Sequence, residues 1–183
     1  MPDLLKPVYW TADMARALPE DGNRYEVVYG ELLATPSPRM LHQLIVGQLH
    51  YALKSYLQGH PVGVVLMAPA DISWAPDVLV QPDVFVAPLE QVRAREWTAV
   101  RDLLLVAEVL SPSNPRQDRF IKRRRYQEAG VPLYWIVDGD ERQIEVWTRT
   151  DLFPRIERHR LVWQPEGVAE PFTLSVEELF RLT

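Results

Sequence analysis

The sequence of 183 residues contains no cysteine, which excludes disulfide bonds and thiolate metal sites. No apolar run reaches the ~20 residues that a membrane-spanning helix requires, so we expect no membrane span. The first ten residues, MPDLLKPVYW, lack the apolar stretch of a secretory signal peptide. These absences together lead us to expect a cytoplasmic protein.

Lysine is also scarce, because only three of the 20 basic residues are lysines: Lys6, Lys54 and Lys122. The net charge of -5 shows that the chain as a whole is not a polycation, so binding of nucleic acid would need a local basic surface. One segment meets that need. Residues 116–125, RQDRFIKRRR, hold six basic residues against one acid.

Hydrophobic periodicity and turn residues predict a mixed central sheet flanked by helices, in the α/β class. Helical spacing favours helices over residues 11–18, 41–57 and 116–129, and in the tail SVEELFRL. Hairpins are predicted over residues 24–34 and from LYWIVD to QIEVWT, and strands at GVVLMA, DVLVQPDVFVA and DLLLVAEVL. The length suits one domain spanning residues 1–183, with a substantial core.

Two carboxylates occupy unusual positions in these strands. Glu108 lies near the end of the apolar run DLLLVAEVL, where it shares a face with Val106 because side chains alternate along a strand. Asp83 opens an apolar strand directly after Pro82. Two acids at the ends of neighbouring strands would repel each other, and a divalent cation between them relieves that repulsion. Ligation by oxygen atoms alone suits Mg²⁺ or Mn²⁺.

The helix predicted over residues 116–129 presents a third candidate. Asp118, Lys122 and Tyr126 are spaced four residues apart and share one face, whereas the arginines point elsewhere. The pKa of a lysine can shift toward neutrality when its side chain is buried. Lys122 could then orient an attacking water or stabilise a charged transition state.

These segments carry a resemblance. QPDVFV, VAEVLSPSN and DRFIKRRRYQEAGVPLYWIVD resemble, in their order and spacing, a large bacterial family of "putative restriction endonucleases". That family belongs to the restriction-endonuclease-like superfamily with the PD-(D/E)XK motif. RYEVVYGELLATPSP, followed by His42, resembles the N-terminal part of the family. The resemblance covers residues 20–148 and implies a restriction-endonuclease-like core.

The resemblance implies a role for each matching residue. Asp83 stands where the metal-binding aspartate falls, and Glu108 stands where the second acid falls. The lysine expected two residues after Glu108 is replaced by Leu110, which departs from the general motif. Lys122 matches a lysine that has moved to the following helix. An additional acid upstream would be Glu26 or Glu31, and His42 would lie near the metal.

The implied activity is hydrolysis of a phosphodiester bond with the help of Mg²⁺ or Mn²⁺. The expected substrate is nucleic acid, and DNA is favoured over RNA. Arg116, Arg119, Arg123 and Arg124 would hold the nucleic-acid backbone. A homo-oligomer is a further expectation, because superfamily members that cut duplexes often act as dimers.

Other interpretations stay open from the sequence. Glu108 could emerge into solvent, Asp83 could be a turn acid, Lys122 could lie on a solvated face, and His42 could be a core residue. The chain could also be a catalytically inactive nucleic-acid-binding or assembly module on the same fold, which the missing lysine at Leu110 favours. A metal-dependent phosphoesterase for small molecules is a third alternative.

Overall fold

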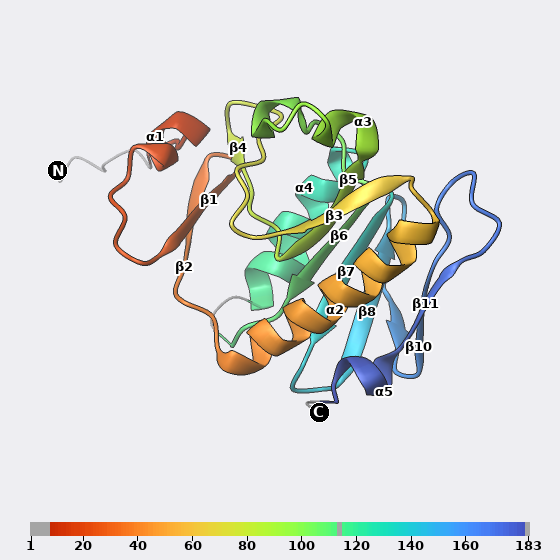
Figure 1. The fold of residues 1–183 in the computed structure, drawn as a ribbon. Coiled ribbons are helices and arrows are strands. Elements are labelled where there is room, and N and C mark those ends of the chain that lie inside the picture. The colour runs from red at the N-terminus through yellow and green to blue at the C-terminus, as the bar shows by residue number, and fades with distance from the viewer. Residues whose placement is uncertain (1–7, 113–114, 182–183) are drawn as a thin grey trace, which may run out of the picture.

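The computed structural model describes residues 8–112 and 115–181, and a six-stranded mixed sheet lies at its centre (Figure 1). The strand order is β3-β5-β6-β7-β8-β9, in which β6 and β7 run parallel and the other neighbours run antiparallel. The strands are β3 (Gly63–Met67), β5 (Val84–Pro88), β6 (Leu105–Val109), β7 (Leu133–Asp138), β8 (Gln143–Thr148) and β9 (Arg155–Glu157).

Two smaller sheets and several helices surround the central sheet. The first small sheet has the order β2-β1-β4, and β10 pairs with β11 in the second. Their strands are β1 (Arg24–Val28), β2 (Glu31–Thr35), β4 (Val78–Leu79), β10 (Arg160–Trp163) and β11 (Phe172–Ser175). The helices are α1 (Ala12–Arg16), α2 (Met40–Gly59), α3 (Leu89–Val92), the 3₁₀ turn η1 (Trp97–Ala99), the π-helical segment η2 (Gln117–Lys122), α4 (Arg123–Glu128) and α5 (Val176–Leu179). Among the described residues, no helix is long and apolar enough to cross a membrane.

The helices cover both faces of the central sheet, with α2 on one side and α4 on the other (Figure 1). The long helix α2 buries Ile45, Leu49 and Leu53, which recur at helical spacing and pack together with the β10–β11 pair and α5. Each such side chain contributes about 1.5–3 kcal/mol when it leaves water. This architecture confirms the predicted α/β class.

The alternation predicted for the strand that contains Glu108 is also confirmed. Leu105, Ala107 and Val109 join the core under α2, whereas Val106 joins the core on the α4 side. Glu108 shares the face of Val106 and therefore points toward α4. A carboxylate is thus directed into the protein, on the face where the helix that carries Lys122 packs.

Local signals located most elements correctly. The hairpin of β1 and β2 turns at Tyr29 and Gly30, which both adopt positive φ, as a two-residue hairpin turn requires. Thr11 caps α1 through a hydrogen bond that its side chain accepts from the backbone N–H of Met14. Gly130 follows α4 with a φ of +83°.

Two expectations about element shape were wrong. The segment DVLVQPDVFVA is two strands, because β4 pairs with β1 and β5 belongs to the central sheet. The chain changes sheets at residues 81–83, where Pro82 has no N–H to donate to either sheet. The predicted continuous helix over residues 116–129 begins with the π-helical segment η2, a form that is frequent at functional sites.

Candidate active site

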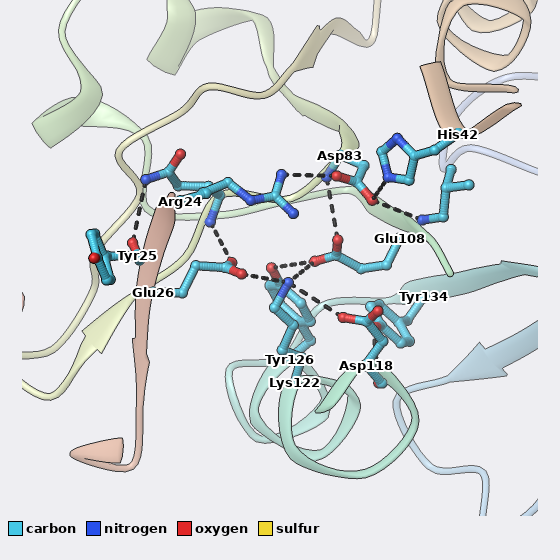
Figure 2. A network of polar contacts seen from close by, with 12 residues as sticks. Arg24, Tyr25, Glu26, His42, Asp83, Glu108, Asp118, Lys122, Tyr126 and Tyr134 are labelled. Carbon is cyan, nitrogen blue, oxygen red and sulfur yellow. Dashed lines mark hydrogen bonds and ion pairs between the residues drawn. The ribbon is translucent and has the colours of Figure 1, made fainter. Parts of the chain in front are cut away.

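A cleft of about 930 Å³ opens beside the first hairpin. Its lining comes from α1, from β1 and β2, from the start of α2, and from the segments that follow β3 and β6. The charged and polar side chains at its floor include Arg24, His42, Asp83, Asp118 and Lys122. Five of the sequence-predicted candidates therefore meet around one cleft (Figure 2). His42, Asp83 and Lys122 line it, Glu108 contacts Asp83 and Lys122, and Glu26 contacts Lys122.

Asp83 lies directly before β5 and is 3% exposed. Its Oδ2 accepts a hydrogen bond of 2.9 Å from the backbone N–H of Val109 and lies 3.0 Å from Nε2 of His42. Its Oδ1 accepts a bond of 2.9 Å from Arg24. Burial alone would raise the pKa of Asp83, but the hydrogen bond from His42 and the charge of Arg24 outweigh burial and hold it well below its usual range. Asp83 is therefore a charged carboxylate at neutral pH.

In the antiparallel pair of β5 and β6, Val84 lies opposite Ala107. Asp83 precedes Val84 and Glu108 follows Ala107. The register therefore sets Asp83 and Glu108 side by side, and the backbone N–H of Asp83 lies 3.4 Å from Oε2 of Glu108. Its Oε1 accepts a bond of 2.9 Å from Nζ of Lys122 and lies 3.4 Å from the hydroxyl of Tyr126. Burial raises the pKa of Glu108 well above its usual range, although the charge of Lys122 opposes the rise.

Lys122, the last residue of η2, lies among three carboxylates (Figure 2). Its Nζ is 2.8 Å from Glu26, 2.9 Å from Glu108 and 3.4 Å from Asp118. Burial alone would lower the pKa of Lys122, but these carboxylates raise it well above its usual range. The suggested shift toward neutrality is therefore wrong, because the negative charges around the ammonium group outweigh its loss of water. The raised pKa favours the charged form of Lys122, whose ammonium group holds Glu108 and Glu26 in place.

Of the two hairpin acids, the structure brings Glu26 to the site and leaves Glu31 outside it. Glu26 is buried, and its Oε1 accepts a bond of 2.8 Å from the backbone N–H of Gln81. Glu31 is exposed at the start of β2, beside the hairpin turn. Asp118 joins the cluster through Lys122, and burial raises its pKa to about 6.

The arginines predicted to bind nucleic acid have other partners. Arg119 forms an ion pair of 2.9 Å with Asp138, the last residue of β7. It forms a second ion pair of 2.6 Å with Glu145 on β8. Arg123 donates to the backbone carbonyl of Arg119 and packs its guanidinium 4.3 Å from the centre of the Trp147 ring. Both side chains therefore attach the helix to β7 and β8 of the central sheet.

Arg116 and Arg124 are exposed, and Arg124 pairs with Glu128 one turn later on α4. None of the four predicted arginines, all of which lie in the described part of the chain, lines the cleft. The reason is helical geometry: when Lys122 points into the cluster, the four arginines project from other sides of the same helix.

Sequence reasoning missed Arg24, which binds Asp83 from β1. The signal was available, because Arg24 and Glu26 are two residues apart on a strand and therefore share a face. Burial of Glu26 beside the acids would have implied that Arg24 points the same way. Sequence spacing could not show which of the four acids Arg24 would meet.

The donor set fits a magnesium-like ion better than a zinc-like ion. Within residues 8–112 and 115–181, no group of three or more histidine, cysteine, aspartate and glutamate side chains is arranged to hold a metal. Mg²⁺ needs less from the protein, because it keeps several waters and binds one or two carboxylates plus substrate phosphates. Asp83 and Glu108 would supply that pair, and Oε2 of Glu108 lies 3.4 Å from the backbone N–H of Asp83.

Comparison with known proteins identifies a family for this chain. The model of the Uma2 family, described as "Putative restriction endonuclease", matches residues 12–182. The chain belongs to the Uma2 family. This membership confirms the resemblance drawn from the motifs, and the family match extends over nearly the whole chain.

The Uma2 chain is also similar to a solved structure, a "putative nuclease belonging to DUF820" from Anabaena variabilis. The two share 21% sequence identity with a TM-score of 0.76, over 93% of this chain and 97% of that chain. At this identity the likeness shows the fold, in agreement with the predicted restriction-endonuclease-like core. A search of curated proteins found no match.

Proposed function

We propose that this Uma2 protein is a nuclease that hydrolyses phosphodiester bonds of nucleic acid with the help of a divalent cation. The observation that carries the proposal is that Asp83, which lines the cleft at the start of β5, lies beside the buried Glu108 of the adjacent strand β6. The family description supports the same class of reaction.

The charge balance of the cluster favours a divalent cation. Four carboxylates converge there: Glu26, Asp83, Glu108 and Asp118. Arg24 and Lys122 form ion pairs with these carboxylates and offset part of their negative charge. The pKa values of Glu108 and Asp118 rise above their usual range with burial, as expected where unbalanced negative charge is held away from water. A divalent cation would stabilise the charged forms of these acids and so oppose the rise in their pKa values.

Asp83 and Glu108 are the residues that would hold the ion, and Mg²⁺ or Mn²⁺ there would activate water and stabilise the leaving oxygen. His42 and the N–H of Val109 fix the orientation of the Asp83 carboxylate. Lys122 fixes Glu108 in the same way, so it acts as a positioning residue.

The test compares cleavage of plasmid DNA, single-stranded DNA and RNA in Mg²⁺ or Mn²⁺. Asp83→Asn removes one charge from the site at nearly constant volume, and the matched control is Asp13→Asn on the exposed face of α1. We expect Asp83→Asn to lower cleavage by about 100-fold or more, since even indirect partners of a metal contribute 10–100-fold. Equal cleavage by wild type and Asp83→Asn would contradict the proposal.

A nucleic-acid-binding module without activity is the second candidate. It is favoured by the internal neutralisation of both acids, since Arg24 pairs with Asp83 and Lys122 with Glu108. Binding that weakens with salt, together with no cleavage of any of the three substrates, would support this module over the nuclease.

A further inference from the structure

Arg24 differs from the other partners of Asp83 in its freedom to move. Val109 donates from the backbone of β6, and His42 projects from the first turn of α2, so both donors are fixed by regular structure. Arg24 reaches Oδ1 of Asp83 at the end of a long side chain that lines the cleft and is 23% exposed. Oδ1 is therefore the oxygen of Asp83 that is most easily released.

Arg24 is also incompletely bonded. Its NH1 donates to Asp83, but its Nε is buried and has no hydrogen-bond partner among the described residues. A buried donor without a partner is costly, and the cost disappears if the guanidinium turns to an acceptor that takes two N–H groups at once. A phosphate is such an acceptor, because the guanidinium fork matches it with two parallel bonds.

We propose that Arg24 exchanges partners during binding: it covers Asp83 before a divalent cation arrives, and it binds a substrate phosphate afterwards. The proposal rests on the proposed function, in which Asp83 and Glu108 hold the cation. A cation bound to these carboxylates would lie close to the positively charged guanidinium of Arg24. Like charges at short range repel each other. Arg24 therefore lowers the affinity for the cation and raises the affinity for the phosphate.

The experiment measures both affinities by calorimetry for wild type, Arg24→Met and Arg24→Lys. Loss of one charge-assisted hydrogen bond corresponds to about tenfold in affinity. We expect Mn²⁺ to bind Arg24→Met about tenfold more tightly than wild type. We expect inorganic phosphate, added at saturating Mg²⁺, to bind it about tenfold more weakly. Arg24→Lys keeps the charge and should stay nearer to wild type in both measurements.

Arg39→Met is the matched control, because Arg39 lines the same cleft and forms no ion pair within the described part of the chain. It should leave Mn²⁺ affinity unchanged. Opposite shifts for cation and phosphate are the signature of partner exchange, since simple damage to the fold would weaken both. Unchanged or weaker Mn²⁺ binding by Arg24→Met would overturn the proposal.

Two further measurements separate this proposal from the proposed function and from misfolding. Asp83→Asn tests the metal site itself: if it abolishes Mn²⁺ binding while Arg24→Met binds no more tightly than wild type, only the role of Arg24 fails. If neither wild type nor Arg24→Met binds Mn²⁺, both proposals fail. In the wild type, the Nε–H resonance of Arg24, identified by its loss in Arg24→Lys, should move on addition of Mg²⁺. A resonance that stays in place would also refute the exchange.

Discussion

Replacement of Lys122 by methionine should cause a large loss of stability. Methionine keeps most of the aliphatic stem and removes the ammonium group, which is 2.8 Å from Glu26 and 2.9 Å from Glu108 in a site that is almost fully buried. Breaking a buried ion pair by removal of one partner costs about 3–5 kcal/mol, because the remaining charge is left unpaired. Two short ion pairs are broken here, so we expect a loss of about 4 kcal/mol or more in the free energy of unfolding.

Thermal unfolding followed by circular dichroism, in EDTA at pH 8, measures this loss. For a protein of this size each 1 kcal/mol shifts the melting temperature by about 2–4 °C, so the expected decrease is about 8–16 °C. Lys54→Met, at an exposed position of α2, is the matched control and should change the melting temperature little. Adding Glu26→Gln and Glu108→Gln to Lys122→Met should restore at least half of the loss. A triple variant no more stable than the single one would refute the reasoning.

Three further predictions concern stability without added metal. The pKa of Asp118 is raised to about 6 by burial, so its charged form opposes folding above that pH, and the cost is relieved as the pH falls toward 4. The wild type should therefore gain up to about 3 kcal/mol from this group between pH 8 and pH 4, and denaturant titrations should show a smaller gain in Asp118→Asn. Gly30→Ala should lower the free energy of unfolding by about 1–2 kcal/mol in the same denaturant titration, because φ is +72° and the added Cβ would collide with the ring of Tyr9. An unchanged denaturation midpoint would contradict this account of the turn. Ser175→Ala should lose about 1 kcal/mol, since the Ser175 hydroxyl caps α5 by accepting from the N–H of Glu178, and Ser175→Asp, which also caps, should lose less.

Local patterns determined much of the candidate site. The period of two in the strand around Glu108 placed this carboxylate on the side opposite the α2 core, and the spacing of Asp118, Lys122 and Tyr126 placed them on one helical face. Pro82 marked the start of β5 and hence the position of Asp83 directly before the first residue of that strand. Such patterns are readable because each follows from the geometry of a single element.

Only the tertiary structure decided which of these faces meet. It selected Glu26 over Glu31, paired Arg24 with Asp83, and turned Arg119 toward Glu145 on β8. Periodicity fixes the direction of a side chain relative to its own helix or strand, but its partner depends on how distant segments pack. The sequence by itself determined where the acids and Lys122 stand in their elements; the packing of the hairpin, α2 and α4 around the sheet decided that opposite charges would be buried together.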